Sequence, residues 1–295
     1  MRLLRSMLFV PGNNMRMITK AAALPSDAVI LDLEDAVPMQ DKETARIFVK
    51  DSLETVKAGG TTVVVRVNSF ATGLLEGDLD SAVSPSLDCV MVPKVDSKAD
   101  ITTAEKMIAE REAGSGAKHG SIEIMPLLET AKGVLNAFEI AGSSTRVIAL
   151  GFGAVDFTRD LGTSWSPDAI ELLYPRAHIS MAAHARGVQP IDTPWVNLQD
   201  REGLVKDSKL ARQLGFAGKM VIHPDQINPV NTVFSVSKEE VEYARKVAAT
   251  FMEAKKAGAG AISLEGKMID EANFRQMQDL LLKAEAIEKK MKKEG

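Results

Sequence analysis

The stretch "AVILDLED", residues 28–35, is an unbroken apolar run that ends in three carboxylates, Asp32, Glu34 and Asp35. A continuous apolar run without polar alternation is typical of a parallel strand buried on both faces. Similar runs recur along the chain, at residues 6–12, 62–69, 89–95, 122–130, 146–156, 188–195 and 219–224. Polar segments of helical composition separate the runs, so the chain alternates between strand and helix.

Eight such runs in order predict an α/β fold, a closed (β/α)8 TIM barrel, because crossover helices cover both faces of parallel strands. An open, doubly wound sheet is the alternative. Its dinucleotide-binding fingerprint is missing, since the first run leads into "PGNN" with no G-x-G-x-x-G motif. The length of 295 residues suits one large domain or two modest ones.

The helical segments carry recognisable ends. Ser97 and Asp100 are suitable caps for a helix that the pattern ends at Gly114, and a second helix is expected at 238–258. We expect residues 1–257 to form the barrel domain and residues 258–295 to form a C-terminal helical lid extension. This extension contains a last helix from Glu271 and would hinge near Gly258 and Gly260, over this barrel or a neighbouring one.

Composition excludes several classes of protein. The net charge of -4, from 40 acidic and 36 basic residues, gives no general attraction to nucleic acid or to a membrane surface. Cys89 is the single cysteine, which excludes an internal disulfide and a multi-cysteine zinc site, and its apolar surroundings predict a buried thiol. No apolar run reaches the ~20 residues of a membrane span, so we expect a cytoplasmic protein.

Polar groups follow every predicted strand. In a TIM barrel the chemistry lies at the carboxyl ends of the strands, where the loops hold side chains in one cleft. The groups at these ends are Asp32, Glu34, Asp35, Arg66, Asn68, Lys94, Glu129, Asp156, Asp192 and His223.

Glu129 and Asp156 follow neighbouring strands, so their carboxylates can converge on one hard cation. Two carboxylates with water and substrate oxygens are the usual ligands of protein-bound Mg²⁺. The alternative is that Glu129 caps the next helix and Asp156 pairs with Arg159. Gly151 and Gly153 favour the metal site, because they allow a ligand to approach the backbone.

Arg66 follows four apolar or β-branched residues in "TVVVR". Its guanidinium offers two parallel donors to a carboxylate or an enolate oxygen. The neighbouring acids Asp32, Glu34 and Asp35 would orient it, and a purely structural ion pair with them is the alternative.

Nearly the whole chain resembles the HpcH/HpaI aldolases, and within them the citrate lyase beta subunit and relatives that cleave malyl-, methylmalyl- or citramalyl-CoA. The resemblance rests on the motifs "RSMLFVPGNN", "LDLEDAV", "DKETAR", "VVVRVN", "VMVPKV", "LLETAKGVLNA", "GFGAVDFTRDLGTS", "GLVKDSKLARQLGFAGKMVIHPDQI" and "LEGKMID". Such members are trimers or hexamers of TIM barrels.

The resemblance implies a role for each matching residue. Glu129 and Asp156 match the ligands of Mg²⁺, with Mn²⁺ as a substitute, and Arg66 matches the arginine that binds the keto acid or thioester oxygen. Asp270 matches an acid that the lid delivers to a neighbouring subunit. Further matches are substrate contacts at Gly153 and Ala154, a supporting shell of Asp32, Glu34, Asp35 and Lys94, and coenzyme A contacts at Arg5, Lys20 and the loop after "VPGNN".

The implied reaction is Mg²⁺-dependent cleavage of a 3-hydroxy-3-carboxyacyl thioester, of the citryl-, malyl- or citramalyl-CoA type, to an acyl-CoA and a 2-keto acid. The keto acid would be oxaloacetate, glyoxylate or pyruvate. Two alternatives stay open: a malyl-CoA thioesterase or condensing enzyme on the same site, and a subunit active only with an acyl-carrier protein. His223 stands where citrate lyase beta subunits often carry Asn, so the acyl group is not fixed by the resemblance.

Overall fold

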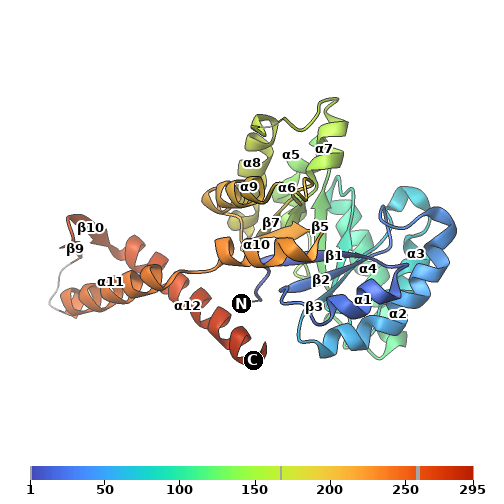
Figure 1. Ribbon diagram of the computed structural model, residues 1–295, viewed down its shortest axis with the longest axis horizontal. Coiled ribbons are helices and arrows are strands. Elements are labelled where there is room, and N and C mark those ends of the chain that lie inside the picture. Colours follow the sequence, from blue (N-terminus) through green and yellow to red (C-terminus); the bar gives the residue numbers. More distant parts are fainter. Residues whose placement is uncertain (1, 167, 257–259, 295) are drawn as a thin grey trace. The chain divides into compact units, whose positions relative to one another are not determined.

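The computed structural model describes residues 2–166, 168–256 and 260–294. Eight parallel strands close into a barrel in chain order, with helices on the outside (Figure 1), which confirms the predicted TIM barrel. The strands are β1 Ser6–Pro11, β2 Ala28–Asp32, β3 Thr62–Arg66, β4 Cys89–Val92, β5 Glu123–Leu128, β6 Ala149–Phe152, β7 Gln189–Asp192 and β8 Gly218–Val221. Seven of these strands lie inside one of the apolar runs, and β8 begins one residue before its run.

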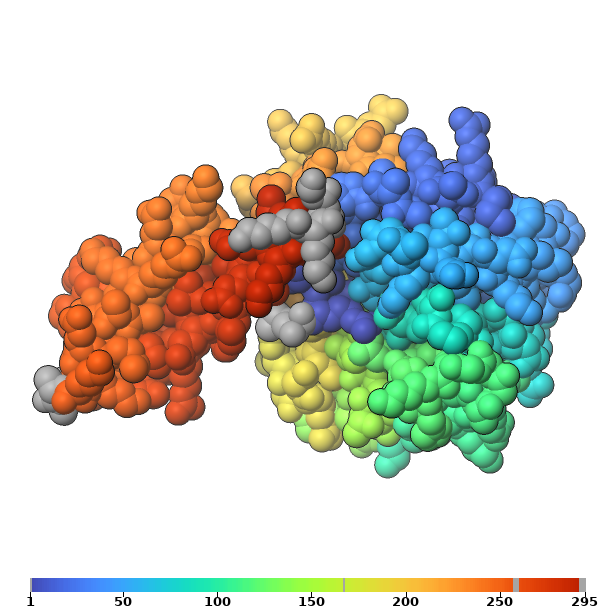
Figure 2. Space-filling view, turned by 90° about the horizontal axis from the view of Figure 1, so that it is seen from below, coloured from blue at the N-terminus to red at the C-terminus, as the bar shows by residue number. Residues whose placement is uncertain are grey.

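Helices follow the strands around the barrel, and in Figure 2 the colours of the barrel pass in order from blue through green to yellow. The helices are α1 Met15–Ala21, α2 Lys42–Ala58, α3 Leu75–Ala82, α4 Lys98–Ser115, α5 Ala131–Leu135, α6 Ala137–Ala141, α7 Ala154–Asp160, α8 Leu173–Arg186, α9 Arg201–Gln213 and α10 Ile227–Phe234. Short 3-10 turns are η1 Met39–Asp41, η2 Phe70–Thr72, η3 Ile170–Leu172 and η4 Pro224–Gln226.

The strand side chains form two apolar layers because successive residues point to opposite faces of the sheet. Ile30 points into the barrel, where it belongs to an interior cluster with Met125 and Met220. Val29 and Leu31 belong to the layer between the strands and the helices. The interior is therefore packed, which leaves the carboxyl ends of the strands as the place for polar chemistry. Cys89 is buried in the interior cluster, as predicted.

Helix α4 shows how local sequence sets an element's ends. Asp100 accepts a hydrogen bond from the backbone N–H of Ser97 at 2.8 Å, which confirms the predicted N-terminal cap. The helix continues past Gly114 and ends at Ser115, before Gly116 with φ 78°. The expected end was wrong by one residue, because the left-handed conformation that stops a helix falls on the second glycine.

The chain divides into two compact units, one of Leu4–Phe234 and one of Ser235–Gly295 with Met1–Leu3. The expected boundary at residue 257 differs from this division, because α11 belongs to the second unit. Its Phe251 stacks on Phe274 with 5.1 Å between ring centroids. Gly258, expected at the hinge, lies outside the described residues.

In its described residues the second unit contains two helices and a two-stranded antiparallel sheet. Its elements are α11 Lys238–Lys256, β9 Ala261–Leu264, β10 Lys267–Asp270 and α12 Glu271–Glu294. The last helix begins at the predicted residue, whereas β10 was not predicted from the sequence. Among the described residues, no helix combines the length and apolar character needed to cross a membrane.

Candidate active site

An ion pair joins the ends of β2 and β3. Asp32 and Arg66 are partners in the parallel register of these strands, so their side chains lie side by side on one face. The Arg66 guanidinium donates from Nε to Oδ1 of Asp32 at 2.7 Å and from Nη2 to Oδ2 at 2.6 Å. Asp32 is fully buried, and its oxygens also accept the backbone N–H groups of Glu34 and Ala36. The acid thus holds both the arginine and the following turn.

Arg66 has two further neighbours at the mouth of the barrel. Its Nη1 lies 3.0 Å from Oε2 of Glu34, and its guanidinium lies over the ring of Phe9. Burial alone would lower the pKa of Arg66, but the charges of Asp32 and Glu34 outweigh it and raise the pKa above its usual range. The arginine is therefore a fixed, permanently charged group.

Lys94 connects this ion pair to Glu129. Its ammonium contacts Oε1 of Glu34 and lies 3.5 Å from Oδ2 of Asp35. Its backbone N–H donates to Oε2 of Glu129 at 2.9 Å, from a left-handed conformation with φ 53°. Such a φ is uncommon outside glycine, so the surrounding contacts maintain it. From the sequence, Asp35 was expected to help orient Arg66, and this expectation was wrong. Asp35 is largely exposed and contacts Lys94 rather than Arg66.

Glu129 directly follows β5 and is almost completely buried. Burial raises its pKa to about 8, with contributions from the negative charges of Glu34 and Asp156, against the lowering effect of Arg66 and Lys94. Loss of solvation is thus the main reason why the ionised form of Glu129 is disfavoured in the metal-free site. A bound cation would stabilise that form.

Asp156 lies in the first turn of α7, and its helix begins against Glu129. A Cβ atom on Gly153, which precedes the helix, would lie 2.5 Å from Cγ of Glu129. The absence of a side chain at Gly153 thus lets the two acidic segments pack together. Asp156 also pairs with the exposed Arg159, at 2.7 Å from Nη2 to Oδ1, as one alternative predicted.

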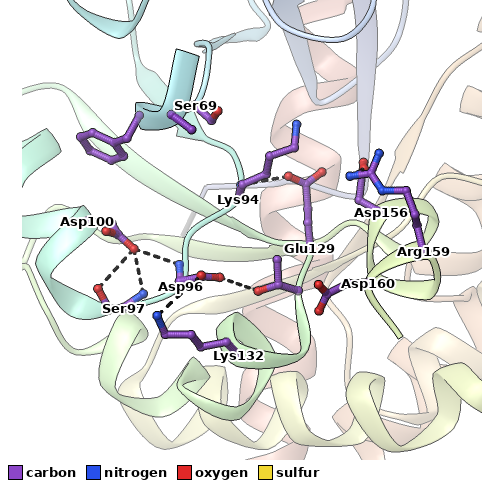
Figure 3. A pocket seen from close by; sticks show the side chains of 13 residues that line it. Ser69, Lys94, Asp96, Ser97, Asp100, Glu129, Lys132, Asp156, Arg159 and Asp160 are labelled. Atoms are coloured by element: carbon purple, nitrogen blue, oxygen red, sulfur yellow. Dashed lines mark hydrogen bonds and ion pairs between the residues drawn. The ribbon is translucent and has the colours of Figure 1, made fainter. Parts of the chain in front are cut away.

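The other part of that alternative is wrong. Helix α5 is capped by Thr130, whose side chain accepts the backbone N–H of Gly133 at 2.9 Å, and not by Glu129. Glu129 is thus free of a helix-capping role, and its carboxylate points into the site (Figure 3).

Glu129 and Asp156 line two adjoining cavities at the barrel mouth. One, of about 400 Å³, is polar and includes Lys94 and Lys132 (Figure 3). The other, of about 220 Å³, includes Arg66 in a largely apolar wall. Gly153 and Ala154, for which the resemblance implies substrate contacts, also line the smaller cavity. The carboxylate pair therefore stands where a molecule in either cavity would meet it.

These residues fit a hard divalent cation. Two carboxylates line the same two cavities, one of them with its charged form disfavoured by burial, and the cavities leave space for water and substrate oxygens. Among the described residues, no group of three or more His, Cys, Asp and Glu side chains could hold a metal ion. A cation at this pair would thus keep open coordination positions, as a catalytic ion requires.

A third cavity, of about 490 Å³, lies beside β1, α1 and η4 and is lined by Arg16, Lys20 and His223 among apolar residues. Lys20 is thus on a groove that suits a phosphate-bearing ligand. The expectation for Arg5 was wrong. It precedes β1, at the opposite end of the barrel, and its Nε and Nη2 bind Asp27 at 2.8 and 2.9 Å.

Asp192 was expected at the mouth because it ends β7, but its side chain points outward between strands and helices. It accepts from Arg176 at 2.9 Å and from Lys219 at 2.6 Å in a buried ionic cluster. A position at the end of a strand fixes where the backbone of a residue lies, but it does not fix the direction in which the side chain points. A one-residue shift along a strand reverses that direction.

Lys42 was missed as a site residue. Its buried ammonium donates to the carbonyl oxygens of Leu33 and Glu34 and to Oδ1 of Asn68, at 2.6, 2.7 and 2.8 Å. It holds the turn that carries Glu34. The motif "DKETAR" was the available signal, although nothing in its spacing shows that a helix lysine reaches this turn.

Asp270 lies in the second unit, at the junction of β10 and α12. Its Oδ1 accepts the backbone N–H groups of Ala272 and Asn273 at 2.9 and 3.1 Å. The residue is therefore an N-cap, and any catalytic contribution would come in addition to this role.

Two protein-family models match this chain. The family model described as HpcH/HpaI aldolase/citrate lyase matches residues 5–224, and a model for C-C bond lyases of the TIM-barrel fold matches residues 176–286. The chain belongs to the HpcH/HpaI aldolase/citrate lyase family.

Relatives with different activities match almost the whole chain. The citrate lyase subunit beta of Leuconostoc mesenteroides subsp. cremoris is 39% identical over 285 residues, which cover 97% of this chain and 94% of that protein. The (3S)-malyl-CoA thioesterase of Cereibacter sphaeroides (strain ATCC 17029 / ATH 2.4.9) is 34% identical over 283 residues, which cover 96% and 95%. The structure of CitE from Mycobacterium tuberculosis with magnesium, acetoacetate and coenzyme A has a TM-score of 0.77 and 29% identity, and the match covers 97% of this chain and 100% of that one.

Proposed function

We propose that the protein is a Mg²⁺-dependent carbon-carbon lyase that cleaves a 3-hydroxyacyl-CoA thioester to an acyl-CoA and a 2-keto acid. The observation that carries this proposal is the carboxylate pair, Glu129 and Asp156, at the junction of two cavities and beside the fixed guanidinium of Arg66. The proposal is supported by the family, and by the magnesium and coenzyme A in the Mycobacterium tuberculosis structure.

Glu129 and Asp156 would hold the cation and leave positions open for the substrate's hydroxyl and carboxylate oxygens. A bound Mg²⁺ supplies Lewis-acid stabilisation of negative charge on those oxygens. The backbone N–H of Lys94 orients one oxygen of Glu129, so the other is directed to the site.

Arg66 would face the thioester oxygen. Cleavage removes the hydroxyl proton, breaks the bond between the second and third carbons, and leaves the electron pair in a thioester enolate. A fixed cation beside that oxygen stabilises charge that is greatest in the transition state. Asp32 and Glu34 hold the guanidinium in place, so no reorganisation is needed as the charge develops.

The groove beside α1 would bind the coenzyme A moiety. Arg16 and Lys20 offer positive charge for its phosphates, and Leu8, Met17 and Ile222 offer apolar surface for the rest. Phe9 and Ile222 line both this groove and the smaller cavity, so a thioester arm can pass from one to the other.

The enolate carbon must then gain a proton to release the acyl-CoA. We assign this step to Asp270 of a neighbouring subunit in a homo-oligomer, a trimer or a hexamer, whose carboxylate would first take up the hydroxyl proton and then pass it to this carbon. The family resemblance supports this assignment, together with the position of Asp270 in a separate compact unit.

The test is an assay of the purified chain with citryl-, malyl- and citramalyl-CoA, in which keto acid and free coenzyme A are measured together. We expect keto acid to appear without free thiol, and activity to vanish after chelation and return with Mg²⁺. Full activity after removal of divalent ions would refute the proposal.

Two alternatives to this function would use the same site. Hydrolysis of malyl-CoA is supported by the 34% identity to a malyl-CoA thioesterase, and it would release free coenzyme A in step with substrate loss. A dependence on an acyl-carrier protein is supported by the 39% identity to a citrate lyase subunit. In that case the chain would process a carrier-bound acyl group and leave free CoA esters intact.

A further inference from the structure

Glu129 and Asp156 lie on two chain segments, and hydrogen bonds join these segments at both ends. At the first joint the backbone N–H of Gly153 donates to the carbonyl oxygen of Leu128 at 2.9 Å. At the second joint the backbone N–H of Ala131 donates to Oδ2 of Asp160 at 2.8 Å. Glu129 lies between the joints on one segment, and Asp156 lies between them on the other.

The first joint is an extension of the barrel. β5 and β6 are paired in register up to Leu128 and Phe152, and the Gly153 contact continues this pairing by one residue. A Cβ on Gly153 would lie 2.7 Å from Oε1 of Glu129, so the segments touch here without intervening side chains. The sheet itself therefore fixes this end.

The second joint depends on one side chain. Ala131 is the first residue of α5, and a backbone N–H in a first helical turn has no partner within its own helix. Asp160 is the last residue of α7 and supplies that partner. Its carboxylate lies beside the segment that follows Glu129 (Figure 3). Asp160 thus connects the far end of the helix that carries Asp156 to the segment that carries Glu129.

The loop after Glu129 has a separate attachment on its other side. The hydroxyl of Thr130 donates to Oδ1 of Asp96 at 2.5 Å, which joins it to the segment after β4. This contact does not involve α7, so it cannot set the position of Asp156. Among the side-chain hydrogen bonds and ion pairs of the described residues, the one that Asp160 accepts is the one that ties α7 to this loop.

We propose that Asp160 is a positioning residue that fixes the separation of Glu129 and Asp156 and thereby favours Mg²⁺ over larger divalent cations. This inference rests on the proposed role of the pair in holding Mg²⁺. Mg²⁺ requires near-octahedral geometry at about 2.0–2.1 Å, whereas Ca²⁺ accepts variable geometry at about 2.3–2.6 Å. A loosened pair therefore loses Mg²⁺ affinity more than Ca²⁺ affinity.

The experiment titrates the metal-stripped full chain with MgCl₂ and with CaCl₂ by calorimetry, for wild type, Asp160→Ala and Asp160→Asn. Asn keeps an acceptor oxygen for Ala131 and loses the charge. We expect Asp160→Ala to weaken Mg²⁺ binding by about tenfold, the lower end of the effect of removing a group that orients a metal ligand. We expect a smaller loss for Ca²⁺, and near wild-type values for Asp160→Asn.

Asp200→Ala is the matched control, because Asp200 caps α9 by accepting the N–H of Gly203 at the same 2.8 Å. The Asp200→Ala substitution should lower the free energy of unfolding by a similar amount and leave the affinities for Mg²⁺ and Ca²⁺ unchanged. Equal losses of Mg²⁺ affinity in Asp160→Ala and Asp160→Asn would show that the charge of Asp160 matters rather than its hydrogen bond, and would overturn the inference. An unchanged Mg²⁺ affinity in Asp160→Ala would also overturn the inference, but the proposed function would stand. A wild-type chain that binds no Mg²⁺ would overturn both.

Discussion

The position of a Cβ atom on Gly153, 2.5 Å from Cγ of Glu129, leaves no space for any other residue there. Gly153→Ala must push Glu129 away or shift the start of α7, and either change separates the carboxylate pair. We expect Mg²⁺ affinity and turnover to fall by a factor on the order of 10². Calorimetry and a keto acid assay measure the two effects.

Gly114→Ala is the control for this substitution. No atom lies within 4 Å of the added Cβ, and Gly114 is inside α4. Alanine should stabilise the helix by about 0.5–1 kcal/mol and leave activity unchanged. Wild-type affinity for Mg²⁺ in Gly153→Ala would show that the contact with Glu129 has no role in metal binding.

Glu129 should make Mg²⁺ binding depend on pH. Burial raises its pKa to about 8, so at pH 7 the carboxyl group of the metal-free protein is mostly protonated. Binding requires the carboxylate and must release about one proton at pH 7 and much less at pH 9. Affinity should rise by about tenfold per pH unit up to pH 8 and then level off. Titrations in two buffers of different ionisation enthalpy would measure the proton release, and its absence would contradict the raised pKa.

The sequence predicts the fold well, because the apolar runs and helix caps are local signals. All eight strands and the capping of α4 by Ser97 and Asp100 were predictable in this way. The site was predictable where side chains follow strand register, as for Asp32 and Arg66. Contacts made across the fold were not. Lys42 reaches a turn from a different element, and the direction of Asp192 depends on where β7 begins.

Arg66→Lys separates catalytic from structural roles. Lysine keeps the charge but cannot donate to both oxygens of Asp32 in parallel while also contacting Glu34. We expect turnover to fall by ~10² or more, with a loss of unfolding free energy of about 1–3 kcal/mol.

Arg5→Lys is the matched variant, since Arg5 binds Asp27 through the same two-point geometry at the opposite end of the barrel. It should lose comparable stability and keep wild-type turnover. If both variants lose turnover in proportion to stability, Arg66 is a structural ion pair alone. Urea denaturation and steady-state kinetics give the comparison.

Acid stability should depend on Glu112. Burial would raise its pKa, but Arg146 and the N–H groups of Gly120 and Ile122 lower it to about 2 from the usual 4.5. A lowered folded-state pKa stabilises the protein above pH 4.5, and this contribution is lost as the pH falls through about 2. Glu112→Gln should cost about 3 kcal/mol at pH 7, since it removes the close partner of a buried cation that keeps only Glu105, at 3.7 Å, as a counter-charge.

The difference in unfolding free energy between wild type and Glu112→Gln should narrow between pH 4.5 and 2. Glu110→Gln changes an exposed acid of the same helix and should show no such dependence. A difference that is constant across this range would mean that Glu112 does not titrate as described.

Asp270 allows a test of whether two chains build one site. Its Oδ1 caps α12, and Asn can accept the same two N–H groups, so Asp270→Asn should fold and bind Mg²⁺ normally. Asn cannot transfer a proton, and turnover should fall by a factor on the order of 10² or more. Asp270→Ala also removes the cap, which should lower the free energy of unfolding by about 1 kcal/mol. Comparison of the two variants therefore separates capping from proton transfer.

Mixing Asp270→Asn with Arg66→Lys then decides which chain the acid serves. If the lid acts on a neighbour, an exchanged 1:1 mixture contains sites with an intact Arg66 from one chain and an intact Asp270 from the other. With random assortment these are roughly a quarter of all sites, and turnover should recover to about that fraction of wild type. If each lid serves its own barrel, every site keeps one defect and mixing restores nothing. Subunit exchange, followed by mass spectrometry of differently labelled chains, must be shown in the same sample, because a lack of recovery refutes sharing only when mixed oligomers are present.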